Sequence, residues 1–172
     1  KGKEQRLYLG EEGTLLTTAP EGKDSYTSYT SDPQNPVPYY PDITTRRKSD
    51  YLIRSQEFVE EREDVLTFLS PVLSEDMIVA GKLTAEIYAA ISTTDADFVV
   101  KVIDVGPNGE TEMMVRANIM RGRYRNSFSE PEAFTPDKVE RVEFDLTDIA
   151  HTFQAGHRIK VQVQSSWFPI FD

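Results

Sequence analysis

Residues 156–169 read Gly-His-Arg-Ile-Lys-Val-Gln-Val-Gln-Ser-Ser-Trp-Phe-Pro, and this stretch decides the fold class. From Arg158 to Ser165, polar and apolar residues alternate, which predicts a β-strand with one apolar and one polar face. The strand ends in an aromatic corner, Trp167–Pro169, and the chain stops at Asp172. Because it also opens at Lys1 without an initiator Met or a targeting signal, we expect a piece of a longer protein.

Composition limits the classes of partner. A length of 172 residues predicts one domain with a substantial core. The net charge of −10 repels phosphate backbones and anionic lipids, and no window approaches the ~18 consecutive apolar residues of a membrane span. The chain has no cysteine, so it offers neither disulfides nor a thiolate site. We therefore expect no nucleic-acid partner and no membrane partner.

Composition also divides the chain into three regions. Residues 1–18 predict a hairpin, because Leu7–Leu9 and Thr14–Thr17 flank Glu11–Gly13. Residues 19–56 predict an extended arm, since prolines exclude regular structure there. The arm carries prolines at positions 20, 33, 36, 38 and 41 and tyrosines at 26, 29, 39 and 40, whose rings we expect to be partly buried.

Residues 57–172 contain most of the expected strands. Ser55–Arg62 tolerates a helix, Thr147–Phe153 suggests a helical turn, and Pro107–Gly109 is a hairpin turn in which Asn-Gly supplies positive φ. The expected strands are Asp64–Leu69, Met77–Ala80, Lys82–Ser92, Phe98–Val105, Glu112–Met120, Arg121–Asn126, Val139–Leu146 and Arg158–Ser165. Short strands at this spacing predict an all-β fold, an antiparallel sandwich or jelly roll.

Alternation assigns the core faces of four strands. The expected core residues are Leu83, Ala85, Ile87 and Ala89; Phe98, Val100 and Val102; Val142, Phe144 and Leu146; and Ile159, Val161 and Val163. Strand 98–105 is apolar on both faces apart from Lys101. It therefore predicts a central strand whose second face is covered by something beyond the facing sheet.

Catalytic signals are weak. The chain lacks Gly-x-Ser-x-Gly, the elbow that presents a nucleophilic serine in α/β-hydrolases. His151 and His157 are the candidate general bases, and structural roles are favoured for both. Asp95 and Asp97 can ligate calcium, but capping of backbone amides is favoured. We expect no catalytic residue, no metal site and no cofactor within these residues.

Arginines and aromatic residues are the candidates for contacts. Arg121, Arg123 and Arg125 alternate, which places them on one side of the expected strand and suggests an ion-pair ladder or a contact with an acidic partner. Trp167 and Phe168 are favoured as core or interface anchors over a platform for stacking sugars.

Five segments resemble a known family. They are Ser31–Pro38 (Ser-Asp-Pro-Gln-Asn-Pro-Val-Pro), Arg62–Phe68 (Arg-Glu-Asp-Val-Leu-Thr-Phe), Asp95–Val105, Gly156–Ile159 and Ser165–Pro169. In this order and spacing, the chain resembles the C-terminal non-catalytic domain of the X-Pro dipeptidyl-peptidase family. That family includes cocaine esterase, α-amino acid ester hydrolases and glutaryl-7-aminocephalosporanic acid acylase-like proteins.

The resemblance implies a galactose-binding-like jelly roll that follows an α/β-hydrolase domain carrying a Ser-Asp-His triad. The chain itself would then be no enzyme, whereas its full-length parent would be a serine hydrolase acting on peptide, ester or amide substrates. The missing N-terminal domain is the implied partner, which this chain would brace while bordering the active-site mouth. The periplasm or the exterior is weakly favoured over the cytoplasm.

Two departures bear on the expected contact residues. Tyr39 and Tyr40 stand where members of the family often have Gly-Gly, so the loop is bulkier here, and the chain ends before the family's Arg-Asn-Pro segment. The candidate residues for substrate-mouth or interdomain contact are Tyr39, Tyr40, Trp167, Phe168, Arg121, Arg123 and Arg125. A carbohydrate-binding jelly-roll module and a free-standing adhesion or scaffold domain are the alternatives.

Overall fold

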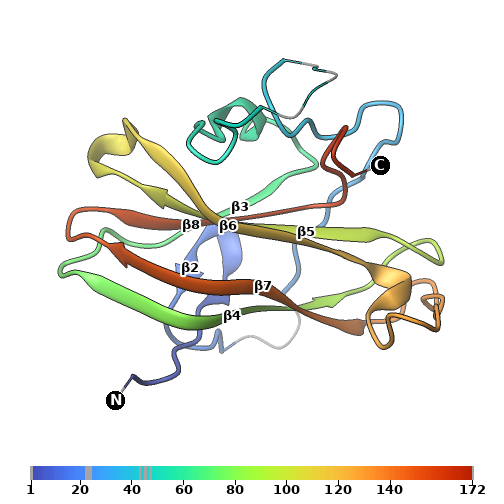
Figure 1. The fold of residues 1–172 in the computed structure, drawn as a ribbon. Helices are drawn as coiled ribbons and strands as arrows, with labels where there is room; N and C mark the ends of the chain where they lie inside the picture. Colours follow the sequence, from blue (N-terminus) through green and yellow to red (C-terminus); the bar gives the residue numbers. More distant parts are fainter. Residues whose placement is uncertain (1, 22–24, 43, 45, 47, 172) are drawn as a thin grey trace.

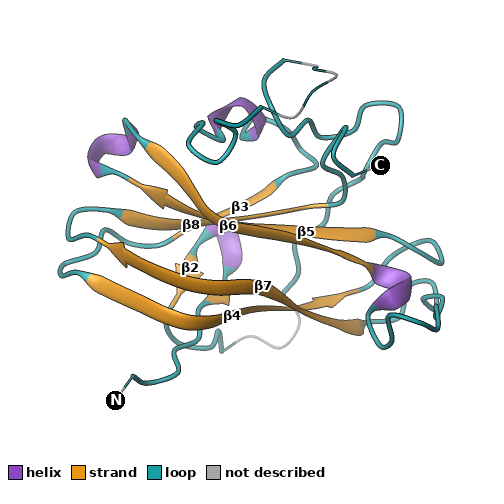
Figure 2. Cartoon of the chain, viewed as in Figure 1, coloured by secondary structure: helices purple, strands orange, loops and turns teal. Residues whose placement is uncertain are grey.

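Two layers of antiparallel strands form the fold in the computed structural model, which describes all residues except 1, 22–24, 43, 45, 47 and 172. One layer has the strand order β3-β8-β5-β6, and the facing layer pairs β4 with β7 (Figures 1 and 2). The strands are β3 (Leu66–Leu69), β4 (Met77–Ala89), β5 (Asp97–Val105), β6 (Glu112–Arg121), β7 (Glu140–Phe153) and β8 (Arg158–Gln164). The expected all-β sandwich is confirmed.

The core between the layers follows from alternation. Every residue expected at the core faces of the strands lies in it or packs against it. Phe68, Phe134 and Phe153 fill the same layer. One side is closed by polar side chains of β6, because Arg116 Nε and Asn118 Nδ2 donate to the carbonyls of Asp148 and Asp145 on β7, both at 2.7 Å.

Two expected breaks in the chain are continuous strand instead. Met77–Ala80 and the expected strand that begins at Lys82 form the single strand β4, which ends at Ala89 rather than at Ser92. Within it Gly81 adopts φ +126°, with no heavy atom near the position of a Cβ. The expected strand 139–146 and the expected helical turn 147–153 together form β7. Thr147, at φ +71°, accommodates the irregular register between Lys82 and Thr84, and beyond it β4 pairs with β7 as far as Phe153. Pairing with a long neighbour therefore overrides the local helical preference.

The expected strand 121–126 is wrong. β6 ends at Arg121, which pairs with Asp97 at the start of β5, so the sheet offers no further partner strand. The chain then turns in the 3-10 segment η4 (Gly122–Tyr124). Gly122 is required there, because a Cβ would lie 2.4 Å from the carbonyl oxygen of Ala96.

The shorter connections agree with expectation. β1 (Tyr8–Leu9) and β2 (Leu15–Leu16) form the hairpin around the 3-10 segment η1 (Glu11–Gly13), and Thr14 bridges to Leu69. The turn at Pro107–Gly109 is the 3-10 segment η3, with φ of +63° at Asn108 and +75° at Gly109. The helix-tolerant stretch contains the 3-10 segment η2 (Glu57–Val59).

The arm covers the outer face of the four-stranded sheet, where it lies beside the C-terminal corner (Figure 1). It supplies a second apolar cluster on the side of β5 away from the main core, with Val99, Ile103 and Val105 at its base. The prediction of a covered second face on β5 is therefore confirmed. Tyr39 and Tyr40 are buried and Tyr29 is partly buried, but the expectation for Tyr26 is wrong, because its side chain is 88% exposed.

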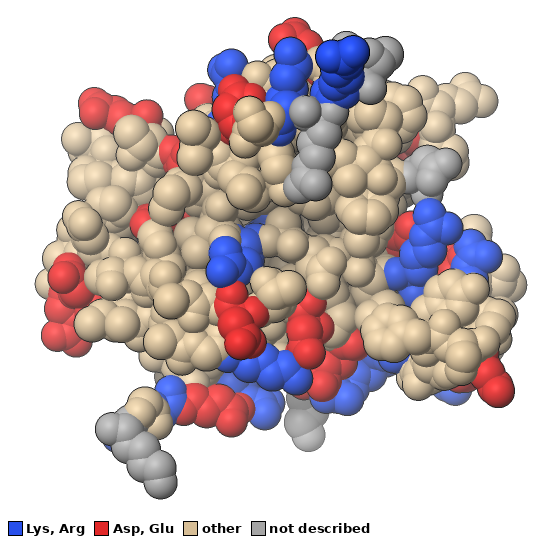
Figure 3. Space-filling model, viewed as in Figure 1, with Lys and Arg blue, Asp and Glu red and all other residues tan. Residues whose placement is uncertain are grey.

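Charges of both signs lie side by side over β4 and β7 in the lower part of Figure 3. Lys82 pairs with Asp145 at 3.0 Å, and Arg141 pairs with Glu86 and Glu143. None of the helical segments in the described part of the chain is long and apolar enough to cross a membrane.

Candidate functional site

The arm and the C-terminal corner meet through backbone hydrogen bonds. The amide of Tyr39 donates to the Phe168 carbonyl at 2.9 Å, and the amide of Phe168 donates to the Val37 carbonyl at 2.8 Å. The Val37 amide also donates to Ser166 Oγ at 2.8 Å. These contacts bring together four candidate residues that are far apart in the sequence: Tyr39, Tyr40, Trp167 and Phe168.

Aromatic rings continue from the arm into the corner. The ring centroids of Tyr39 and Tyr51 are 6.1 Å apart, those of Tyr51 and Trp167 are 6.2 Å apart, and those of Trp167 and Phe171 are 6.3 Å apart. Tyr39, Tyr40 and Trp167 are 2%, 5% and 5% exposed, whereas Phe168 is half-buried. Three of the four residues are thus internal anchors, and a platform for sugars would require them to be exposed.

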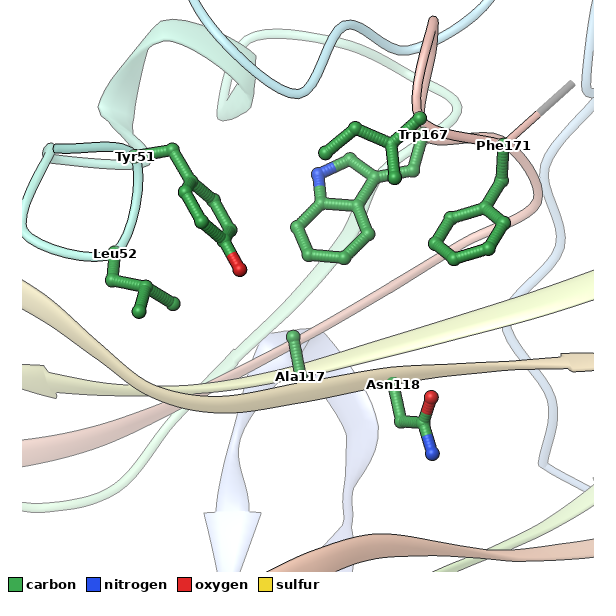
Figure 4. A pocket seen from close by; sticks show the side chains of 7 residues that line it. Tyr51, Leu52, Ala117, Asn118, Trp167 and Phe171 are labelled. Carbon is green, nitrogen blue, oxygen red and sulfur yellow. The ribbon is translucent and has the colours of Figure 1, made fainter. Parts of the chain in front are cut away.

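A pocket of about 190 Å³ opens between these rings and β6. Figure 4 shows Tyr51, Trp167 and Phe171 ranged over Ala117, which forms the floor. Asn118 turns to the other side of β6, where it binds β7. The small side chain of Ala117 leaves the space that the aromatic rings surround.

A buried charge lies beneath the aromatic corner. Lys101 is fully buried on β5, its Nζ donates to Gln56 Oε1 at 2.9 Å, and the same nitrogen lies 5.6 Å from the centroid of the Trp167 ring. Burial lowers the pKa of Lys101 from its ordinary value of 10.5 to about 7, although the negative charge of Glu112 acts in the opposite direction.

Glu112 and Lys160 attach the segment around η2 to the sheet. Glu112 Oε2 accepts from the Gln56 amide at 2.7 Å and from Ser55 Oγ at 2.9 Å. Lys160 pairs with both Glu112 and Glu60. Burial alone would lower the pKa of Lys160, but its bonds to the two carboxylates outweigh burial and raise that pKa.

The three arginines do not share one face. Arg121 lies 3.7 Å from Asp97, and Arg123 pairs with Asp95 at 2.6 Å. The side chain of Arg125 is only 1% exposed, covers the Phe134 ring and pairs with Glu140. The expected ion-pair ladder is wrong, because the segment expected to form its strand is a turn. Ion pairing is nevertheless the role that all three arginines have.

Asp95 caps a backbone amide, as expected, because its Oδ1 accepts from the Arg123 amide at 3.0 Å. Within the described residues, no group of three or more His, Cys, Asp or Glu side chains could hold a metal ion.

Both histidines contact one carboxylate. His151 Nε2 lies 2.7 Å from Asp104 Oδ2, and His157 Nδ1 lies 2.8 Å from Asp104 Oδ1. Among the residues that the structure describes, neither ring is paired with a serine hydroxyl. Asp104 lies on β5 at an inward position, two residues beyond Val102. That polar residue in an apolar alternation was the signal that could have revealed the cluster.

Comparison with known proteins identifies the family of this chain. Residues 1–172 match the family described as the X-Pro dipeptidyl-peptidase C-terminal non-catalytic domain. The chain belongs to this family. The resemblance inferred from its five segments is therefore confirmed, and so is its character as a C-terminal non-catalytic domain.

Three proteins to which the chain is similar are much longer than it. Cocaine esterase of Rhodococcus sp. (strain MB1 Bresler) is 32% identical over 96% of this chain and 30% of its own length. An aminopeptidase from a marine sediment Thaumarchaeota archaeon superposes with a TM-score of 0.90 at 40% identity, over 96% of this chain and 30% of the other. An α-amino acid ester hydrolase superposes with a TM-score of 0.85 at 38% identity, over 96% and 29%. The chain thus spans about 30% of the length of these relatives.

Proposed function

We propose that this chain is the accessory domain of a larger serine hydrolase, in which it braces an N-terminal α/β-hydrolase domain and borders the mouth of its active site. The observation that carries the proposal is the match of the whole chain to a C-terminal non-catalytic domain, in relatives of which it covers about 30%. The names of those relatives point to ester and peptide substrates for the parent enzyme.

The described side chains support a bracing role over a catalytic one. Both imidazoles are bonded to Asp104, so each has a structural partner inside the domain. Buried rings tie the arm and corner to the sheet, and Lys160 on β8 pairs with Glu60 beside η2, which makes that end of the domain stiff enough to support a neighbour. Tyr39, Tyr40 and Trp167 shape this surface from within, while Phe168 and the half-exposed Arg121 and Arg123 are available to touch the neighbouring domain.

An activity assay tests whether catalysis requires the parent enzyme. The 172-residue chain and the full-length parent are assayed side by side with an α-amino acid ester and an aminoacyl-prolyl p-nitroanilide. We expect turnover by the parent alone, because acyl transfer needs an activated nucleophile that the described residues do not provide. Turnover by the isolated chain, abolished by replacing His151 or His157, would contradict the proposal.

A further inference from the structure

The second apolar cluster, between the arm and the sheet, is closed at its centre and open over β6. Val99, Ile103 and Trp167 are buried at the centre. The members on β6 and around the aromatic pocket are only partly buried; they are Tyr51, Ala117, Ile119, Ile170 and Phe171. The pocket over Ala117 lies in this opening (Figure 4). The arm therefore leaves part of the outer face of β6 uncovered.

Two exposed apolar side chains continue this opening onto the surface. Leu52, which lines the pocket, is 42% exposed, and the adjacent Ile53 is 69% exposed. Backbone bonds fix this segment, because the Met114 amide on β6 donates to the Leu52 carbonyl at 2.9 Å and the Ile53 amide donates to the Asp50 carbonyl at 3.1 Å. Large apolar side chains held in exposed positions beside a pocket are typical of a contact with another protein surface.

Basic side chains border the opening, although the chain as a whole is acidic. Residues 44–54 contain four Lys or Arg residues and one Asp, whereas the net charge of the chain is −10. Lys48 and Arg54 lie over the ring of Tyr40, at 6.0 and 5.3 Å from its centroid. Asp50 pairs with Arg54 at 3.0 Å, but no carboxylate among the described residues pairs with Lys48. Lys and Arg side chains gather over the arm at the top of Figure 3. This rim favours a partner surface that carries acidic side chains.

The pocket has the size of a single side chain. Its volume of about 190 Å³ lies below the roughly 300–1,000 Å³ of sites for small molecules. Protein interfaces commonly centre on one apolar anchor in such a pocket, surrounded by a polar rim.

The parent enzyme supplies a partner that is always close by. The chain matches a C-terminal domain and covers about 30% of the similar proteins, so most of their length lies outside the matched part. A neighbour in the same polypeptide has an effective concentration on the order of mM, and a small contact surface is therefore sufficient for docking.

We propose that this opening is the docking site for the N-terminal domain of the parent enzyme, which places one apolar side chain over Ala117 and acidic side chains beside Lys48. The inference rests on the proposed accessory function and specifies the surface which that function uses. Docking completes the second apolar cluster, because it covers Leu52 and Ile53 and fills the pocket. A second copy of this chain is the poorer occupant, since symmetric pairing would oppose two basic rims.

Hydroxyl-radical footprinting of the full-length parent and of the 172-residue chain tests the site. Ile53 should be oxidised roughly tenfold more slowly in the parent, because docking removes its side chain from water. Ile78 is the matched residue, since it is 77% exposed but lies on β4 in the other layer, and its oxidation should be equal in the two proteins. Equal oxidation of Ile53 in the two proteins overturns the inference. Protection of Ile53 that increases with the concentration of the isolated chain identifies a second copy as the occupant and also overturns it.

Two substitutions of opposite charge test the chemistry of the partner. In the parent, Ile53→Glu and Ile53→Lys both remove the apolar contact, but only the glutamate repels an acidic surface. We expect Ile53→Glu to abolish the protection of Leu52 against oxidation, Ile53→Lys to retain most of it, and Ile78→Glu, the matched control, to leave it unchanged. Equal loss of protection with both charges, or loss with Ile78→Glu, contradicts the proposal.

The footprint and the activity assay separate the two proposals. If only the docking site is wrong, Leu52 and Ile53 stay reactive in the parent while turnover still requires the parent. If the accessory function is wrong, the isolated chain itself turns over substrate.

Discussion

At the scale of single residues, strand β5 buries one ionisable side chain on each of its faces. Lys101 points toward the arm and Asp104 toward the space between the sheets. Each is hydrogen-bonded to side chains distant in sequence: Gln56 in one case, His151 and His157 in the other. The alternation of the strand predicts which face each residue occupies, but the partner depends on which segment packs there.

The buried ammonium predicts a pH dependence of stability. Between pH ~7 and the ordinary Lys pKa of 10.5, the unfolded chain binds a proton at Lys101 that the folded chain has lost, so stability due to this group rises with pH in that window. Below pH ~7 both states are protonated, and the cost of burial is constant. In Lys101→Met this contribution is absent. The free energy of unfolding of the variant, relative to the original protein, should therefore fall by up to about 1.4 kcal/mol per pH unit across the window.

Urea denaturation at a series of pH values measures that difference. In the variant Gln56 loses its hydrogen-bond donor, and the resulting loss in the free energy of unfolding is the same at every pH. It therefore shifts the curve of this free energy against pH without changing its slope. Lys82→Met is the control, because the Lys82 side chain is 65% exposed and should give a flat difference. Parallel curves for the original protein and Lys101→Met would show that Lys101 is not desolvated.

At the scale of elements, long-range pairing decides where strands and turns begin. β4 and β7 each run past a residue with positive φ, Gly81 and Thr147, because each is the hydrogen-bonding partner of the other. The chain after β6 turns instead, since β5 offers no further partner. The connection from η4 to β7 is then held by two buried side chains, Phe134 in the core and Arg125 above its ring.

Replacing that arginine should loosen the connection. Arg125 donates to the carbonyls of Gly122, Glu132 and Ala133 and pairs with Glu140. Arg125→Lys keeps the charge but loses the planar fork, so we expect a loss of about 1–3 kcal/mol in the free energy of unfolding. Hydrogen exchange read by mass spectrometry should rise selectively in residues 126–139.

Arg123→Lys provides the comparison, because the Arg123 side chain is 46% exposed and forms an ion pair with Asp95. Its effect should stay within about 0.5 kcal/mol. Equal effects of the two substitutions would show that burial of Arg125 does not hold the connection.

At the scale of the whole molecule, one sheet serves two cores. Phe98, Val100 and Val102 face β4 and β7, while Val99 and Ile103 face the arm. The second core depends on the aromatic corner, because Trp167 contacts both the arm and the sheet.

Removing the indole should release the arm before the sandwich unfolds. Trp167→Ala leaves a large cavity in the second core and should cost about 3–5 kcal/mol. Limited proteolysis should cut near Val37–Tyr40 while β4–β8 remain intact, with fragments identified by mass spectrometry. Phe128→Ala, at a side chain that is 86% exposed, should change neither stability nor the cleavage pattern. Simultaneous loss of arm and sandwich would mean that the two cores unfold as one unit.

The sequence alone determined the all-β class, the inward faces of four strands, the Asn-Gly turn and the family. Each of these depends on neighbouring residues or on short motifs, because alternation reports burial along a single strand. Only the tertiary structure decided that 147–153 is strand, that 122–124 is turn, and that Lys101, Asp104 and Arg125 meet their particular partners. These outcomes depend on segments far apart in the sequence, such as Met77 and Phe153, which pair between β4 and β7. A one-dimensional pattern contains no information on which distant backbone completes a sheet or which side chain meets a buried charge.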